Sequence, residues 1–157
     1  MSKITPCLWF DTEAEVAANF YTSLFKDSQI LEVSRYGPGA PLPEGTALTV
    51  RFQLWGQEFT ALNGGPMFTF NEAVSFQVDC ESQDEVDYFW DSLVEGGEES
   101  QCGWLKDKFG LSWQIIPNAL PGLIGDPDPE RAQRAMQAML QMRKIDIDAI
   151  RRAADQA

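Results

Sequence analysis

The sequence predicts an α+β fold made of two tandem β-α-β-β-β modules followed by a C-terminal helical tail. Two internal repeats indicate the duplication: FYTSL at 20–24 recurs as FWDSL at 89–93, and GQEFTAL at 56–62 is echoed by GLSWQII at 110–116. A third observation concerns secondary structure, because short runs in which apolar and polar residues alternate are typical of half-buried strands. Two copies of one supersecondary unit explain these repeats better than chance does.

The first module is predicted over residues 1–65. It starts with a strand at 4–10, after which Asp11 and Thr12 are candidate N-caps for a helix that runs to about Phe25. One apolar face of that helix is expected to be buried, and it carries Val16, Phe20 and Leu24. Three more strands follow, with a Pro/Gly loop after the first of them, and we expect these strands at 28–36, 47–55 and 57–63.

The second module is predicted over residues 73–120, after a link at 64–72. Its first strand is expected at 73–80, and Ser82 opens a helix that Gly96-Gly97 ends. The apolar residues of this helix recur at helical spacing and are expected to face the sheet: Val86, Phe89, Trp90, Leu93 and Val94. The remaining strands are expected at 98–106 and 111–117.

The helical tail is predicted over residues 128–157. Asp128-Pro129-Glu130 is typical of a helix start, with a cap followed by proline at the first helical position. Asp146 is expected to cap a last short helix. The buried stripe of the first tail helix is expected to hold Met136, Met139 and Leu140. Modules and tail are predicted to form a single domain over 1–157, because a chain of this length is large enough for one core.

Composition excludes several classes of function. The chain has no histidine, which removes Ser-His-Asp and Cys-His nucleophilic schemes, histidine general bases and every metal site that needs histidine. The net charge of −12 argues against nucleic acid or an anionic membrane as a partner, since phosphates would be repelled. No apolar run reaches the ~18–20 residues that span a bilayer. Three scattered cysteines and no apolar signal core predict a cytoplasmic protein.

Charge is unevenly spread along the chain. Residues 1–130 hold 21 acidic and 6 basic residues, whereas residues 131–157 hold 3 and 6. A solvated acidic body with a cationic tail helix explains this distribution. A tail that docks against its own body or against a second subunit explains it as well, and the sequence leaves both interpretations open.

Two segments carry a resemblance to a known family: WFDTEAEVAANFYTSLF at 9–25 and CGWLKDKFGLSWQIIP at 102–117. The chain resembles the vicinal oxygen chelate superfamily of glyoxalases, bleomycin-resistance proteins and extradiol dioxygenases. Within it, the chain resembles the PhnB-like group labelled 3-demethylubiquinone-9 3-methyltransferase. The resemblance implies a glyoxalase/bleomycin resistance-like fold whose curled sheets share a cleft. We predict no cofactor and no methyltransferase chemistry, because the sequence has no glycine-rich strand-to-helix turn for a nucleotide-type cofactor.

Metal-using members of this superfamily take His and Glu ligands from the first and last strand of each module. Carried over by position, the first strands offer Thr5 and Ala73. The last strands offer Thr60 and Gln114, and a small shift in register would replace Thr60 by Asn63. Neutral amide and hydroxyl oxygens bind first-row divalent metals poorly, so we predict no metal centre. Gln114 then either binds a ligand or hydrogen-bonds to a neighbouring group.

Strand alternation predicts which side chains face the cleft rather than the helices. On the helix side we expect Leu8, Phe10, Val74, Phe76 and Val78. The expected ligand-binding residues on the other side are Thr5, Cys7, Trp9, Thr60, Asn63, Ser75, Gln77, Trp104, Ser112 and Gln114, with Trp55 as a further candidate. Aromatic walls with a few neutral polar groups are typical of a small-molecule site.

The charged side chains of the modules mark no catalytic site. No pair of carboxylates has the spacing of a general acid and base, so the catalytic residues are unknown. Arg51 lies inside a strand, where it meets an anionic ligand or lies on an exposed face, and the sequence does not decide between the two. Lys106, Asp107 and Lys108 are expected to form a solvated charge cluster on a turn.

The expected function is therefore a small-molecule-binding protein of the vicinal oxygen chelate fold without the usual divalent metal. The alternative is a metal-dependent lyase, isomerase or dioxygenase-like enzyme in which Asn63, Gln114 and a nearby carboxylate recruit a metal. An interaction module whose cleft stays empty is a third interpretation. Whether the protein is an enzyme is left open.

A homodimer is expected as well. Relatives in the superfamily commonly dimerise, and a curled sheet leaves edge strands that must be covered or paired. The Met136, Met139 and Leu140 stripe also needs an apolar partner. We expect residues 129–157 to lie at the interface or to brace it.

Overall fold

The computed structural model describes residues 3–156, which form two compact units. Unit 1 extends to Phe70, and unit 2 begins at Asn71. The predicted first module, residues 1–65, falls within unit 1. The predicted second module, residues 73–120, and the tail both fall within unit 2. No helix in the described part of the chain is long and apolar enough to cross a membrane.

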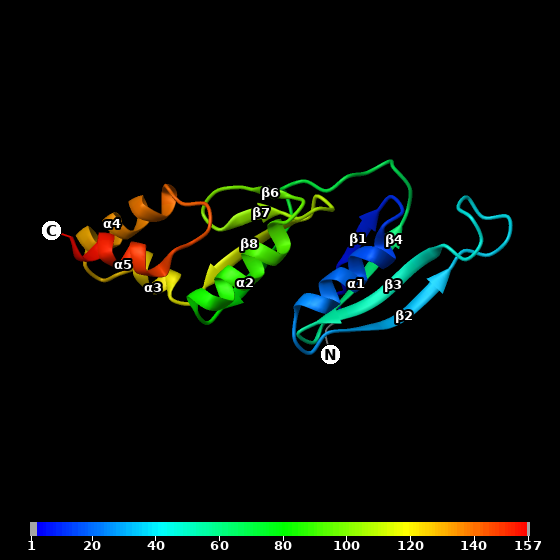
Figure 1. Ribbon diagram of the computed structural model, residues 1–157, viewed down its shortest axis with the longest axis horizontal. Helices are drawn as coiled ribbons and strands as arrows, with labels where there is room; N and C mark the ends of the chain where they lie inside the picture. The colour runs from blue at the N-terminus through cyan, green and yellow to red at the C-terminus, as the bar shows by residue number, and fades with distance from the viewer. Residues whose placement is uncertain (1–2, 157) are drawn as a thin grey trace. The chain divides into compact units, whose positions relative to one another are not determined.

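Unit 1 is a four-stranded sheet with one helix on one of its faces (Figure 1). Strand order is β1-β4-β3-β2, with β1 parallel to β4 and the other pairs antiparallel. Its elements are β1 (Cys7–Phe10), α1 (Ala14–Leu24), β2 (Gln29–Arg35), β3 (Ala47–Leu54) and β4 (Gln57–Asn63). Trp55 and Gly56 join β3 to β4 with φ angles of 48° and 79°, as a tight two-residue hairpin turn requires. The predicted order of helix and strands is confirmed.

Helix α1 buries a different face from the one predicted. Its buried residues are Ala14, Ala17, Ala18 and Tyr21, whereas Val16 is 60% exposed. The sheet below the helix is filled by large side chains, among them Phe52 and Phe59, which stack at 5.4 Å between ring centroids. Alanines let the helix approach such a bulky surface closely, so the small residues face inward.

The start of α1 is also held in an unexpected way. Neither Asp11 nor Thr12 caps the helix, and its N-cap residue, Glu13, makes no side-chain cap bond. Instead the Ala14 N–H donates to Asn63 Oδ1 at 2.8 Å, and Asn63 Nδ2 donates to the Ala47 carbonyl at 2.9 Å. Asn63 is 1% exposed, so its amide ties the helix start to the sheet from within the core.

Unit 2 repeats this arrangement with strand order β5-β8-β7-β6. Its module consists of β5 (Ser75–Cys80), α2 (Gln83–Val94), β6 (Glu98–Glu99), β7 (Trp104–Lys106) and β8 (Ser112–Pro117). The single strand predicted at 98–106 is interrupted by a turn, where Cys102 and Gly103 have φ angles of 57° and 87°. The prediction that Val74 packs on the helix side is wrong, because Val74 precedes β5 and is 65% exposed.

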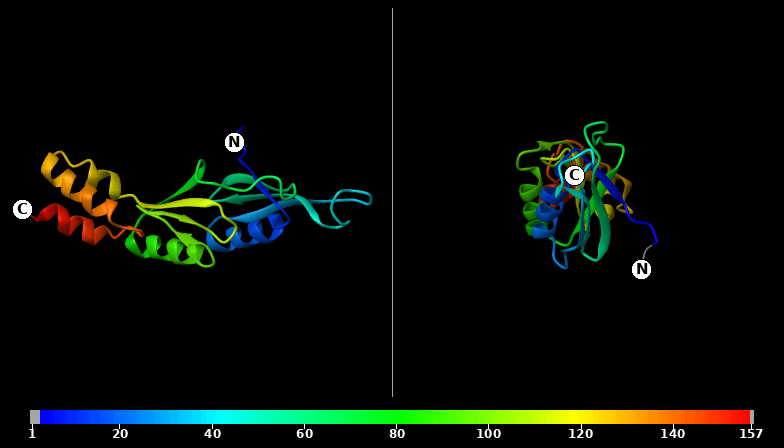
Figure 2. Two further views of the ribbon diagram at one scale, coloured as in Figure 1. Left: turned by 90° about the horizontal axis from the view of Figure 1, so that it is seen from above. Right: turned by 90° about the vertical axis from the view of Figure 1, so that its right-hand side faces the viewer.

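Helix α2 begins at the predicted cap and lies along one face of the unit 2 sheet (Figure 2). Of the five residues predicted to face the sheet, Val94 is only half-buried. The Ser82 hydroxyl accepts from the Glu85 N–H at 3.2 Å, which caps the first turn. The buried residues of the helix are Val86, Phe89, Trp90 and Leu93, and they meet one face of the sheet. On the strands, Val78, Leu105, Trp113 and Ile115 are buried. The other face of this sheet is left without a helix of its own module.

The predicted tail at 128–157 holds the two helices expected there, α4 (Pro129–Leu140) and α5 (Ile147–Asp155). A further helix that was not predicted, α3 (Leu120–Ile124), lies between β8 and the tail. The predicted caps are confirmed, since Asp128 Oδ1 accepts from the Glu130 N–H and Asp146 Oδ1 accepts from the Ala149 N–H, each at 3.0 Å. The predicted apolar stripe is wrong in part: α4 buries Ala135, while Met136 and Leu140 are 36% and 50% exposed. Around Ala135 the core is completed by Leu120, Ile145, Ile150 and Ala154.

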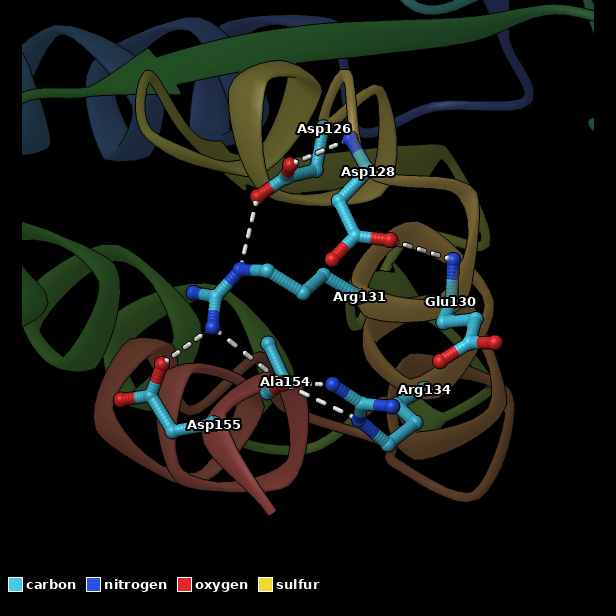
Figure 3. A network of polar contacts seen from close by, with 7 residues as sticks. All are labelled: Asp126, Asp128, Glu130, Arg131, Arg134, Ala154 and Asp155. Carbon is cyan, nitrogen blue, oxygen red and sulfur yellow. Dashed lines mark hydrogen bonds and ion pairs between the residues drawn. The ribbon is translucent and has the colours of Figure 1, made fainter. Parts of the chain in front are cut away.

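Two arginines of α4 fasten the end of α5 (Figure 3). Arg134 donates from Nε and Nη2 to the Ala154 carbonyl, at 3.0 and 2.7 Å. Arg131 pairs with Asp155 at 2.7 Å and with Asp126 at 3.2 Å. Cations at a helix C-terminus satisfy its free carbonyls and oppose its dipole, so this network holds the two helices together.

The tail is also attached to its own module. In the turn before β7, the Cys102 N–H donates to the Met142 carbonyl at 2.9 Å, and the Gly103 N–H donates to the Arg143 carbonyl at 2.8 Å. Gln83 at the start of α2 bonds to the backbone of Ile145 and Ile147, at 2.9 and 2.8 Å. Of the two interpretations of the cationic tail, the structure therefore shows the second, with the tail docked against the module of unit 2.

Candidate functional site

Each sheet has an open face, opposite to the face that its module helix covers. Residues that pair across neighbouring strands share a face, so the register identifies its members. In unit 1 a row across the open face consists of Cys7, Thr60, Arg51 and Glu32. In unit 2 one row consists of Ser75, Ser112, Lys106 and Glu98, and the next of Gln77, Gln114 and Trp104.

The open face of unit 1 centres on an ion-paired arginine. Arg51 donates to Glu58 at 2.6 Å and to Glu32 at 3.4 Å, and its hydrogen bond to the Glu58 carboxylate is the main cause that raises the Arg51 pKa. Thr5 Oγ1 donates to the other oxygen of Glu58 at 3.5 Å. The sequence left open whether Arg51 meets an anionic ligand or lies on an exposed face. Its guanidinium lies on the open face, where two carboxylates already neutralise it.

Trp9 lies on the same open face, but its own unit partly covers it. The indole Nε1 donates to the Gly65 carbonyl at 2.9 Å, and the ring of Phe68 meets it edge-on at 5.0 Å. A side chain at Gly64 would overlap the Trp9 ring, so only glycine allows this approach. Trp55, by contrast, is in the β3–β4 turn and packs against Phe25, away from the open face.

Gln114 has a partner within unit 2. Its Nε2 donates to Ser75 Oγ at 2.9 Å, across the parallel pair β5–β8. Gln77 Nε2 donates to Asp79 at 2.8 Å on the same strand. Ser75 stands opposite Ser112 in the register, whereas Ala73 lies outside β5. The first strand of this module therefore presents Ser75, and not Ala73, beside the residues of β8.

A pocket of about 100 Å³ opens at the β6–β7–β8 side of unit 2. Its polar lining includes Glu72, Glu98, Glu99, Trp104, Lys106 and Ser112. Lys106 Nζ pairs with Glu72 at 3.2 Å, and this bond is the main cause that lowers the Glu72 pKa. Ser112 is 1% exposed, and among the described residues its Oγ is a buried polar atom without a hydrogen-bond partner.

The charged part of this pocket was not predicted from the sequence. Lys106 was expected in a solvated cluster on a turn, whereas it lies on β7 and shares the open face with Ser112. The signal was available, because Lys106 is two residues from Trp104 and a strand repeats every two residues. Asp107 does not belong to a solvated cluster either, since it is 2% exposed.

The residues present do not fit a divalent metal centre. The positions carried over from metal-using members hold Thr5, Ala73, Thr60 and Gln114, none of them charged, and Gln114 bonds to Ser75. Within residues 3–156, no three Cys, Asp or Glu side chains gather so that they could hold a metal ion. The nearby carboxylate of Glu58 is engaged by Arg51.

Burial disfavours the thiolate form of two of the three cysteines, Cys7 and Cys80. All three are free. Burial raises the pKa of Cys80 to about 12, so its thiol stays protonated at neutral pH. Burial also raises the pKa of Cys7, a residue of the open face. Cys102 Sγ contacts the Met139 carbonyl at 3.7 Å, in the joint between the module and the tail.

Comparison with known proteins identifies one family model. The model described as 3-demethylubiquinone-9 3-methyltransferase matches residues 2–116, which include β1 to β7 and all of β8 except Pro117. A PhnB protein from Bacillus cereus with the same family name has a solved structure. It is 40% identical, with a TM-score of 0.70, and the match covers 74% of this chain and 99% of that chain. No curated protein matches the chain.

More distant solved structures share the fold. A protein from Pseudomonas aeruginosa is 18% identical with a TM-score of 0.61, covering 74% of this chain and 98% of that one. A fosfomycin resistance protein from Listeria monocytogenes, in complex with Mn(II) and sulfate, is 12% identical with a TM-score of 0.52. That match covers 76% of this chain and 92% of that one. The family match ends before α3, so the tail helices lie outside it.

Proposed function

Because this chain belongs to the 3-demethylubiquinone-9 3-methyltransferase family of PhnB-like proteins with the vicinal oxygen chelate fold, we propose that it binds a small molecule on the open faces of its sheets. We propose further that it does so without a divalent metal. The metal-free part of the proposal rests on the side chains at the positions where metal-using members have their ligands. All of these side chains are neutral, and one of them, Gln114, bonds to Ser75. A neutral set binds first-row metals poorly.

The composition of the open faces supports binding of a small molecule. The open face of unit 1 carries Trp9 and Thr60. That of unit 2 carries Trp104, Gln77 and Ser112. Each face by itself combines an aromatic ring with polar groups that could orient a ligand. Ligand sites in proteins are commonly apolar with a small number of directional contacts. Methyltransferase chemistry is not part of the proposal, because the fold offers no doubly wound sheet for a nucleotide-type cofactor.

Two measurements test this function. Metal analysis of the purified protein should find no stoichiometric Zn²⁺, Ni²⁺ or Mn²⁺, and a chelator should leave ligand binding unchanged. A thermal-shift screen across small metabolites should find compounds that raise the melting temperature, since binding to the native state stabilises it. A tightly held metal at one per chain would favour a metal-dependent lyase, isomerase or dioxygenase-like enzyme and overturn the metal-free proposal. An empty screen would favour an interaction module.

We also propose a cytoplasmic homodimer. Three free cysteines suit a reducing compartment. Each four-stranded sheet has two edge strands, β1 and β2 in unit 1 and β5 and β6 in unit 2, and such edges favour pairing. Met136 and Leu140 are exposed one turn apart on α4, where a second copy would cover them.

A further inference from the structure

Ser112 is the starting point for naming a class of ligand. Its side chain lines the pocket of unit 2, on the open face, and its Oγ has no hydrogen-bond partner among the described residues. A buried hydroxyl that loses its bonds to water without gaining others costs free energy. A ligand group that bonds to this hydroxyl would recover that free energy.

The pocket has room for more than one water molecule. A single water needs roughly 10–15 Å³ of such space, whereas this pocket offers about 100 Å³. That volume suits a ligand, or part of one, with a few non-hydrogen atoms.

The charges around the pocket favour a cation. Glu72 and Glu98 lie around it with a single cation, Lys106, whereas Glu99 also lines it but stands opposite Leu105 in the register, on the helix side. Lys106 is paired with Glu72, and Glu99 is engaged by Arg143 at 3.5 Å and by the Trp90 indole at 3.2 Å. Glu98 makes no ion pair within residues 3–156, although it stands opposite Lys106 in the register. An anion would face an excess of negative charge here, and the net charge of −12 on the chain adds to that effect.

Trp104 completes the recognition surface. It is half-buried, lines the pocket and lies one register step from Lys106 on β7. The face of an indole attracts a cation within about 6 Å of its centre.

We propose that this pocket binds the primary ammonium group of a small organic cation, which donates to Ser112 Oγ and to the Glu98 carboxylate beside Trp104. This inference names a ligand class for the open face of unit 2 and so rests on the proposed function. Ammonium N–H groups suit the site because a serine oxygen and a carboxylate both accept hydrogen bonds.

The test uses three probes of similar size on the full-length protein: ethylammonium, acetate and 1-propanol. Titrations are followed by the backbone amide resonances of Ser112, Trp104 and Lys106. Ethylammonium should shift them with saturation at a Kd on the order of 1 mM or weaker, since a ligand of three heavy atoms has little contact. Acetate and propanol should bind at least tenfold more weakly.

Variants that change the charge of the pocket test the sign of the ligand's charge. Glu98→Gln should weaken ethylammonium binding about three- to fivefold, and Lys106→Met should strengthen it about two- to fivefold. Glu95→Gln removes the same charge from an exposed residue that is not part of the lining, and should change Kd less than twofold. Ser112→Ala should weaken binding roughly fivefold without lowering the melting temperature, because the hydroxyl it removes has no partner.

Three outcomes of the titrations would overturn the inference. Tighter binding of acetate, with Lys106→Met weakening it, would assign an anion site. Equal binding of propanol would mean recognition by size alone, and no shift with any probe would leave ordered water as the partner of Ser112. If the metabolite screen finds ligands that are not amines, the proposed function stands and this inference fails. If stoichiometric metal is found, the amine titration still decides the inference by itself.

Discussion

At the scale of single residues, Asp107 shows how a turn is built around a buried carboxylate. Its Oδ1 accepts from the N–H groups of Phe109 and Leu111 at 2.9 and 3.0 Å, and its Oδ2 accepts from the Trp113 indole at 2.8 Å. Three donors compensate the carboxylate for the water that burial removes. The carboxylate thereby ties the β7–β8 turn to a core tryptophan.

We predict that Asp107→Asn destabilises the protein by about 1–3 kcal/mol, because the amide nitrogen would face the Trp113 N–H and leave two donors without acceptors. Urea unfolding followed by far-UV circular dichroism measures this loss. Adding Trp113→Phe to the Asn variant removes one of the opposed donors, so the two substitutions should be less than additive. Strict additivity would show that the Asp107–Trp113 bond does not matter.

A second pair of substitutions tests the register of β8. Trp113 is 3% exposed on the side of α2, and Trp113→Ala should cost about 3–5 kcal/mol. Gln114 is half-buried on the open face, and Gln114→Ala should cost about 1 kcal/mol or less, for one bond to Ser75. The same unfolding experiment compares the two. A larger cost at Gln114 would place the strand in the opposite register.

At the scale of the elements, the helix starts separate what the sequence could predict from what it could not. Ser82, Asp128 and Asp146 cap helices from adjacent positions, and all three were predicted. The bond that holds the start of α1 comes from Asn63, 49 residues away from Ala14. A pattern within a few residues cannot reveal a partner that only the fold brings close. The same reason explains why the alanine face of α1 was missed.

Removing the Asn63 amide should therefore loosen α1. Asn63→Ala takes away the acceptor for Ala14 N and the donor to the Ala47 carbonyl, and we expect a loss of about 2–3 kcal/mol. Hydrogen exchange should accelerate first at the amides of the first turn of α1. Asn19→Ala, on the exposed side of the same helix, is the control and should change stability by less than about 0.5 kcal/mol. If Asn63→Ala and Asn19→Ala changed the stability equally, Asn63 would not be the residue that holds the start of α1.

The contact between α2 and the tail should weaken in acid. The hydrogen bond from Gln83, and then Lys144 at 3.0 Å, hold the pKa of Asp87 below its ordinary value of 3.8. A carboxyl with a lowered folded pKa stabilises the fold above its unfolded pKa, and loses that effect as the pH falls below 3.8. Both side chains are over a third exposed, so solvent keeps the contribution small, roughly 0.5 kcal/mol.

Hydrogen exchange at the amides of Ile145 and Ile147 measures this dependence. Between pH 5 and pH 2, protection should fall more in the wild type than in Asp87→Asn, which lacks the titrating group. The variant should already be less protected at pH 5. If both proteins lose protection equally, Asp87 does not contribute to holding the tail.

At the scale of the whole molecule, the duplicated architecture was predictable and the pairing of polar groups was not. Repeats at fixed offsets and strand alternation are properties of the chain itself, so they indicate the order and faces of the strands. Which polar groups bond to each other depends on the register between strands, as for Gln114 with Ser75 across β8 and β5. That Ser112 would be buried without a partner depends on the same register.

Assembly is the property for which the tail matters most. Deleting residues 129–157 would remove α4 and α5 and uncover Leu120 and Ile116, which pack against them. We expect the deletion to abolish the proposed dimer or to cause aggregation. Because loss of the tail core would also disturb unit 2, the deletion alone does not identify the interface.

A surface variant separates these effects. Met136 and Leu140 are exposed on α4, outside the core around Ala135, so replacing both by glutamate should leave the fold and its circular dichroism spectrum unchanged. If a second copy covers this face, burying two carboxylates there is costly, and sedimentation should show the double variant as a monomer where the wild type is a dimer. The matched control replaces Gln133 and Gln137, two exposed residues of the same helix, by glutamate. This control should leave the dimer intact if those residues lie outside the interface. A wild-type monomer at tens of micromolar would rule out the dimer, and a double variant that still dimerises would place the interface elsewhere, at the edge strands.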